Sequence, residues 1–163
     1  MNILLIRHAD AVPREGSDLP DEERPLTEEG KKQCRALAEA LRRQGVELGK
    51  VVTSPLLRAR QTAAGLLEEW PDPKPEVLTC AALAPEGKDK KLTRFIRGLD
   101  TDRVTLIGHA PDINEFLAWL IGSRKSQVQV AKAGAALIEC EAGPSKGGGV
   151  LTWLVTPRRS PGN

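Results

Sequence analysis

Asn2-Ile-Leu-Leu-Ile-Arg7-His8 places four adjacent apolar residues directly before an arginine and a histidine. An uninterrupted apolar run of this length is typical of a strand that is covered on both faces, at the centre of a parallel sheet. Val104-Thr-Leu-Ile107 has the same character and is followed by Gly108-His109. The two stretches therefore predict two buried strands, each of which ends in a histidine.

Helical patterns separate these strands. Thr27 is expected to cap a helix that carries an apolar stripe and ends near Gly45. Ser54-Pro55 has the residue types of a capping hydroxyl and a first helical position, and predicts a helix that runs to about Trp70. Two more helices are expected over residues 88–97 and 111–121, and shorter strands over 50–53, 76–78, 135–141 and 150–155.

Strands that alternate with helices predict a three-layer α/β sandwich with a mostly parallel central sheet and right-handed crossovers. The length of 163 residues suits one compact domain. We expect this domain to span residues 1–156 and to be followed by a frayed tail over 157–163.

Composition excludes several classes of function. The net charge is only +2 and the 24 basic residues are scattered, so no nucleic-acid partner is expected. The 3 cysteines are far apart, which argues against a disulfide framework and against a zinc site. No apolar run is long enough for a signal peptide or a membrane span, so we expect a cytoplasmic protein with no membrane partner. The chain also lacks the glycine-rich motifs that cradle nucleotide phosphates.

The only 2 histidines of the chain, His8 and His109, follow the two buried strands. Ligands of open α/β sheets bind at the carboxyl ends of the strands, so neighbouring strands would bring both imidazoles into one crevice. Arg7 precedes the first histidine, and Arg58 is expected in the first turns of a helix that also follows a strand. Two guanidinium groups that grip the same anion favour a phosphoryl ligand.

Three blocks, taken in order, resemble the signature of the histidine phosphatase superfamily, which includes the phosphoglycerate mutases. These blocks are Arg7-His8-Ala9, Ser54-Pro-Leu-Leu-Arg58-Ala-Arg-Gln-Thr62 and Gly108-His109. The short chain and the Arg24-Pro-Leu-Thr27 segment are similar to SixA-type phosphohistidine phosphatases. Ala9 stands where the family motif has glycine, and its Cβ is expected to affect the geometry of this loop.

The resemblance implies a phosphoglycerate mutase-like fold and a role for each matching residue. His8 is the expected nucleophile, which becomes phosphorylated in its neutral form. Arg7 and Arg58 are expected to hold the phosphoryl oxygens, and His109 to donate to the same oxygens. Two interpretations of Arg24 are equally favoured: a third arginine at the rim of the site, and a partner in a loop salt bridge. The chemistry needs no metal and no cofactor.

The interval 71–98 leaves little room for the lid of larger relatives. Glu86 is the only candidate for a general acid within it, although a surface turn is the better interpretation of this residue. Imidazole leaves more readily than an alkoxide, because its conjugate acid has a pKa of about 6.5. We therefore expect a monomer that acts on phosphohistidine carried by another protein, such as a phosphotransfer domain. A phosphatase for small phosphate esters is the alternative enzyme, and a mutase is less favoured. A weakly active phosphoprotein-binding module is the alternative from another class.

Overall fold

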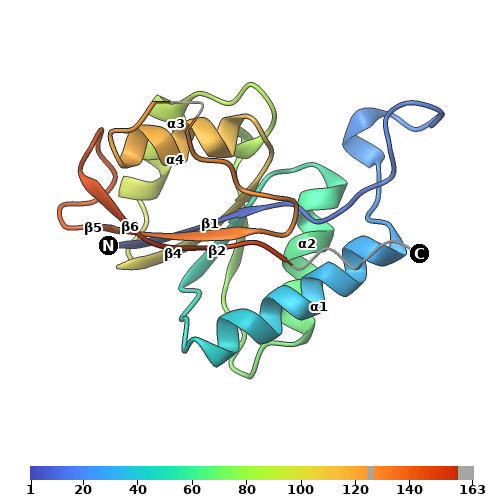
Figure 1. Ribbon diagram of the computed structural model, residues 1–163, viewed down its shortest axis with the longest axis horizontal. Coiled ribbons are helices and arrows are strands. Elements are labelled where there is room, and N and C mark those ends of the chain that lie inside the picture. The colour runs from blue at the N-terminus through green and yellow to red at the C-terminus, as the bar shows by residue number, and fades with distance from the viewer. Residues whose placement is uncertain (125–126, 158–163) are drawn as a thin grey trace.

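The computed structural model describes residues 1–124 and 127–157. It confirms an α/β architecture built on a six-stranded sheet (Figure 1). The strands are β1 (Asn2–Arg7), β2 (Lys50–Thr53), β3 (Val77–Thr79), β4 (Arg103–Gly108), β5 (Ala135–Cys140) and β6 (Gly149–Val155). The α-helices are α1 (Glu28–Arg43), α2 (Leu57–Glu68), α3 (Asp89–Arg97) and α4 (Asp112–Leu120), with short 3-10 helices η1 (Asp21–Glu23) and η2 (Ala81–Leu83).

The sheet has the strand order β3-β2-β4-β1-β5-β6. The first four strands in this order are parallel, whereas β5 pairs antiparallel with β1, and β6 pairs antiparallel with β5. Helices α1 and α2 cover one face and α3 and α4 the other, as Figure 1 shows. The predicted three-layer sandwich with a mostly parallel sheet is therefore confirmed.

The position of β1 between two helical layers explains why its apolar run is unbroken. Leu4 and Ile6 pack in the core cluster that includes residues of α1 and α2, whereas Ile3 and Leu5 pack in the cluster that includes residues of α3 and α4. Alternate side chains of a strand point to opposite faces, so a strand between two helical layers needs apolar residues at every position.

Strands β1 and β4 are direct neighbours, which is the arrangement that the two histidines require. Arg7 is paired with Gly108 in the parallel register, and the His8 amide donates a 3.0 Å hydrogen bond to the Gly108 carbonyl. Both strands therefore end together at one edge of the sheet, and His8 and His109 are the next residues.

The element boundaries agree closely with the sequence patterns except at the start of α2. Helix α1 begins after Thr27, whose hydroxyl accepts a hydrogen bond from the Gly30 amide as predicted. The prediction that Ser54 caps the second helix is wrong, because Leu56 is the N-cap residue with φ −68° and ψ 140° and offers no side-chain cap. Extended backbone at Leu56 delays the helix, and the Ser54 hydroxyl is engaged elsewhere.

Ala9 adopts a backbone conformation that is open to residues other than glycine. Ala9 is fully buried and does not adopt a positive φ, so its backbone does not need glycine. Its methyl group belongs to a small cluster with Ala11, Leu26, Cys34 and Ala133. The Cβ of Ala9 is thus part of the packing beneath this loop.

No helix among residues 1–124 and 127–157 is long and apolar enough to cross a membrane. The tail expected over 157–163 lies, apart from Pro157, outside the described residues.

Candidate active site

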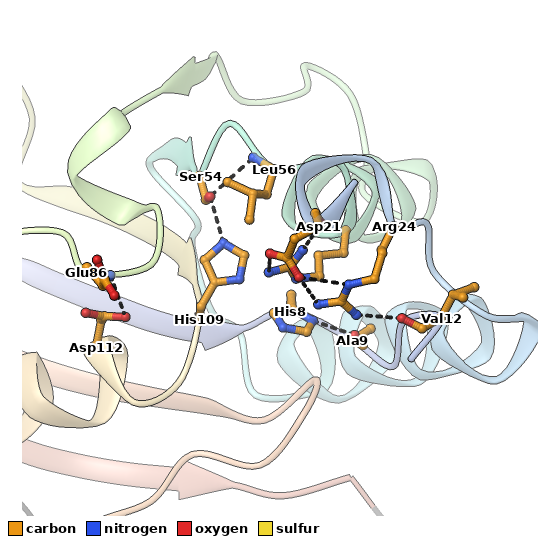
Figure 2. A network of polar contacts seen from close by, with 11 residues as sticks. His8, Ala9, Val12, Asp21, Arg24, Ser54, Leu56, Glu86, His109 and Asp112 are labelled. Carbon is orange, nitrogen blue, oxygen red and sulfur yellow. Dashed lines mark hydrogen bonds and ion pairs between the residues drawn. The ribbon is translucent and has the colours of Figure 1, made fainter. Parts of the chain in front are cut away.

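The two imidazoles lie side by side at the carboxyl edge of the sheet (Figure 2). The ring centroids of His8 and His109 are 5.1 Å apart, and the ring planes are inclined by 53°. Both residues are buried, with 8% and 3% of their surface exposed. Buried histidines need specific hydrogen-bond partners, and each ring has one.

The hydrogen bond of His8 determines which ring nitrogen carries the proton. Its Nδ1 lies 2.7 Å from the carbonyl oxygen of Ala9. A carbonyl oxygen only accepts, so Nδ1 must carry the hydrogen when this bond forms. Neutral His8 then has its lone pair on Nε2, and this is the atom available for nucleophilic attack.

His109 is held through its other nitrogen. Its Nε2 lies 2.7 Å from the Ser54 hydroxyl, and this hydroxyl also accepts a 3.3 Å hydrogen bond from the Leu56 amide. The Nδ1 of His109 is buried and has no hydrogen-bond partner. Figure 2 shows this free nitrogen on the side of the ring that faces His8 and Asp21. When Ser54 donates to Nε2, the Nδ1 of the neutral ring carries a hydrogen that can bind an anion.

Two guanidinium groups accompany the histidines. Arg58 is 4% exposed and extends from the first turn of α2, where its terminal nitrogens donate to the Asp21 carbonyl at 2.7 Å and to the Asp21 Oδ2 at 3.2 Å. Arg7, at the end of β1, donates to the Val130 carbonyl at 3.3 Å. The Nε atoms of both arginines are buried without a partner. Buried donors without a partner are costly, so these groups indicate a site for an anion.

Arg24 is connected to the site through Asp21. Its Nε and Nη2 donate to the Asp21 Oδ1 at 3.0 and 2.8 Å, and its Nη1 donates to the Val12 carbonyl at 2.5 Å. The contacts of Arg24 are therefore those of a loop salt bridge, and Asp21 connects Arg24 to Arg58. The structure thus brings Arg7, Arg58 and the two histidines together, with Arg24 at their margin.

Both histidines are neutral at physiological pH. Burial is the main reason that the pKa of His8 lies at about 4 instead of 6.5, and the positive charges of Arg58 and Arg7 act in the same direction. Burial also lowers the pKa of His109, to about 3, and the charges of His8 and Arg58 add to this effect. A neutral His8 keeps its nucleophilic lone pair.

Sequence reasoning missed the roles of three further residues. Asp21 pairs with a helix 37 positions away, and a polar loop gives no pattern that predicts this contact. Ser54 was expected as a helix cap and instead orients His109. Thr62 accepts a 3.0 Å hydrogen bond from the Ala9 amide and donates at 2.7 Å to the Arg58 carbonyl, so it joins the His8 loop to α2. Its place in the Ser54–Thr62 block was the one available signal.

Glu86 lies in an exposed turn and has a positive φ of 64°. Its amide donates a 3.3 Å hydrogen bond to the Asp112 carboxylate, which connects this turn to the start of α4. The interval 71–98 is occupied by β3, η2 and α3. Among the residues that the structure describes, no group of three or more His, Cys, Asp and Glu side chains is arranged to hold a metal ion.

Comparison with known proteins identifies close parallels. Residues 3–83 match the family model of the histidine phosphatase superfamily, branch 1. An uncharacterised protein of Picosynechococcus sp. is 33% identical over 141 residues, which cover 82% of each chain. The phosphohistidine phosphatase SixA of Escherichia coli K12 is 30% identical over 165 residues, which cover 96% of this chain and 94% of SixA.

The fold is similar to a solved structure of the protein histidine phosphatase SixA complexed with tungstate. The TM-score is 0.81 at 26% sequence identity, and the match covers 96% of this chain and 97% of the other. Sequence and fold thus agree over nearly the whole length of both proteins. The chain belongs to the histidine phosphatase superfamily.

Proposed function

We propose that this phosphatase hydrolyses phosphohistidine on a partner protein, through a covalent phosphoryl intermediate on His8. The observation that carries the proposal is the Nδ1 hydrogen bond of His8 to Ala9, which leaves a neutral Nε2 beside two partly unpartnered guanidinium groups. A nucleophile and an anion-binding set then lie together at the carboxyl ends of β1 and β4. The SixA sequence and the solved SixA structure, named for phosphohistidine and protein histidine phosphatase activity, support the choice of donor.

The first step transfers the phosphoryl group between two imidazoles. The Nε2 of His8 attacks phosphorus while the P–N bond of the donor breaks and its electron pair returns to the donor nitrogen. The donor ring, protonated beforehand on its other nitrogen, leaves as neutral imidazole, and the positive charge passes to the ring of phospho-His8. Arg7, Arg58 and the free Nδ1 of His109 stabilise the oxygens of the transferred group.

The second step releases phosphate. Water attacks phosphorus, the bond from phosphorus to Nε2 of His8 breaks, and neutral His8 is restored with its proton still on Nδ1. Both hydrogens of the water leave with dihydrogen phosphate, so no further acid or base is consumed. The cycle does not use a carboxylic general acid, which agrees with the position of Glu86 in an exposed turn.

The partner in this proposal is a protein that presents phosphohistidine, such as a phosphotransfer domain, and the compartment is the cytoplasm. Cys34, Cys80 and Cys140 are free thiols, which fits a reducing environment.

The proposal is tested by comparing kcat/KM for a protein that carries phosphohistidine with kcat/KM for a small ester such as glycerol 3-phosphate. We expect faster turnover of the phosphohistidine protein, and Arg58→Ala should abolish it while Arg60→Ala, an exposed neighbour on α2, should not. Faster turnover of the ester would favour the small-ester phosphatase. Binding of the phosphoprotein without any hydrolysis would identify the chain as a binding module.

A further inference from the structure

Asp21 places a carboxylate among the groups that bind the phosphoryl anion. Figure 2 shows its side chain above His8, between His109 and Arg24. One carboxylate oxygen accepts from Arg24 and the other from Arg58. A carboxylate beside an anion-binding site opposes binding of the anion, so it can affect which ligands the site accepts.

The position of this carboxylate is determined by contacts on several sides. Arg24 is itself anchored to the Val12 carbonyl, and Arg58 also donates to the backbone carbonyl of Asp21. Asp21 begins η1 directly after Pro20, whose φ is −54°. Burial raises the pKa of the Asp21 carboxyl, but hydrogen bonds from Arg24 and the charge of Arg58 outweigh this effect and lower it. The Asp21 carboxylate therefore stays ionised at neutral pH.

We propose that Asp21 determines specificity by charge: it disfavours substrates with a second anionic group beside the phosphoryl group and favours a leaving group that is neutral or cationic. This inference rests on the proposed function, because imidazole is such a leaving group. The phosphoryl group itself would meet the unpartnered Nε atoms of Arg7 and Arg58, whereas a further carboxylate on the substrate would lie near the negative charge of Asp21.

The leaving group gives the same carboxylate a favourable role. The donor imidazole departs readily only when its other nitrogen is protonated, and a fixed negative charge nearby favours that protonated ring. At a separation of about 7 Å and an effective dielectric constant of about 40, two unit charges interact enough to change an equilibrium roughly tenfold. A single carboxylate can therefore discriminate between a cationic ring and an anionic ester.

The simpler interpretation is that Asp21 only holds Arg58 in place. Asp21→Asn removes the charge and keeps the backbone carbonyl contact to Arg58, while its single amide oxygen can still accept from one of the two arginines. A positioning role predicts that all phosphoryl ligands lose affinity by the same factor. A charge-selecting role predicts that the affinities of the ligands change by different factors, according to the charge beside the phosphoryl group.

Calorimetry with glycerol 3-phosphate and 3-phosphoglycerate provides the test, since 3-phosphoglycerate carries a carboxylate where glycerol 3-phosphate has an uncharged group. For Asp21→Asn we expect the affinity for 3-phosphoglycerate, relative to glycerol 3-phosphate, to rise roughly tenfold. Glu22→Gln is the matched control, because it removes the same charge from the next residue, which is exposed. It should leave the ratio unchanged, and Asp21→Ala should repeat the result of Asp21→Asn.

An unchanged ratio in Asp21→Asn, or binding of neither ligand, would overturn the inference. The proposed function is judged separately by phosphohistidine turnover of the unaltered protein. A second outcome is that the unaltered protein fails to hydrolyse phosphohistidine while Asp21→Asn still shifts the ligand ratio. That result would reject the phosphohistidine donor and retain charge selection by Asp21.

Discussion

Arg58 combines burial, a fixed carboxylate partner and a free Nε, and these features make its shape as important as its charge. A lysine at this position would keep the positive charge but lose the planar fork of donors. We expect Arg58→Lys to lower kcat/KM by about 100-fold, because one preorganised donor set for the phosphoryl oxygens is lost. Steady-state kinetics measures this effect, and Arg60→Lys on the exposed side of α2 should stay close to the unaltered protein.

The protonation of His8 can be observed directly, because the chain has only 2 histidines. With a pKa of about 4, His8 should stay neutral down to about pH 5 and keep its proton on Nδ1. NMR of the imidazole nitrogens over pH 4–8 checks both points. Titration of His8 near pH 6.5, or a neutral ring protonated on Nε2, would contradict the geometry of the Ala9 contact.

Residue patterns predicted the members of the site that lie at strand ends and on α2. Arg7, His8 and His109 follow directly from two buried strands whose register brings their ends together. Asp21 could not be predicted, because it lies in a polar loop and its partner Arg58 is distant in sequence. Such contacts depend on how a loop folds back, which local periodicity does not encode.

At the scale of elements, one hydroxyl joins the end of β1 to α2. Thr62 accepts from the Ala9 amide and donates to the Arg58 carbonyl, and it is fully buried. We expect Thr62→Val to lower the free energy of unfolding by about 1–3 kcal/mol, since the buried Ala9 amide loses its partner. Denaturant unfolding measures this loss.

Thr93→Val is the matched control for that measurement. The Thr93 hydroxyl on α3 is buried and has no hydrogen-bond partner, so its replacement removes an unsatisfied group. We expect the control to be neutral or slightly stabilising. Equal losses in both variants would show that packing, and not the link between β1 and α2, determines the effect.

Helix and strand boundaries were predictable where capping and apolar periodicity agree. Thr27 caps α1 as its position before Glu28 and Glu29 indicates, and Gly45 follows its end with a φ of 67°. The start of α2 differs because Leu56 has an extended backbone, while the Ser54 hydroxyl bonds to His109 and accepts from the Leu56 amide.

For the whole molecule, the two buried histidines make stability depend on pH. In the unfolded chain they titrate near pH 6.5, whereas in the folded protein their pKa values are about 4 and 3. Between these limits the unfolded chain binds more protons, so the free energy of unfolding should fall as the pH drops from about 6.5 to about 4. Denaturant unfolding at pH 7, 5.5 and 4.5 checks this trend.

The histidines themselves can be tested as the origin of this trend. His109→Asn removes one of the two titrating groups, so its stability should depend less on pH over the same range. The same slope in both proteins would assign the effect to other groups.

The central claim is that a phosphoryl group resides on Nε2 of His8 during turnover. The most direct measurement is to incubate the protein with a phosphohistidine protein carrying labelled phosphate, quench rapidly, and map the acid-labile label along this chain. We expect the label on His8, and none in His8→Asn. Label on another residue, or hydrolysis at an undiminished rate in His8→Asn, would contradict the account.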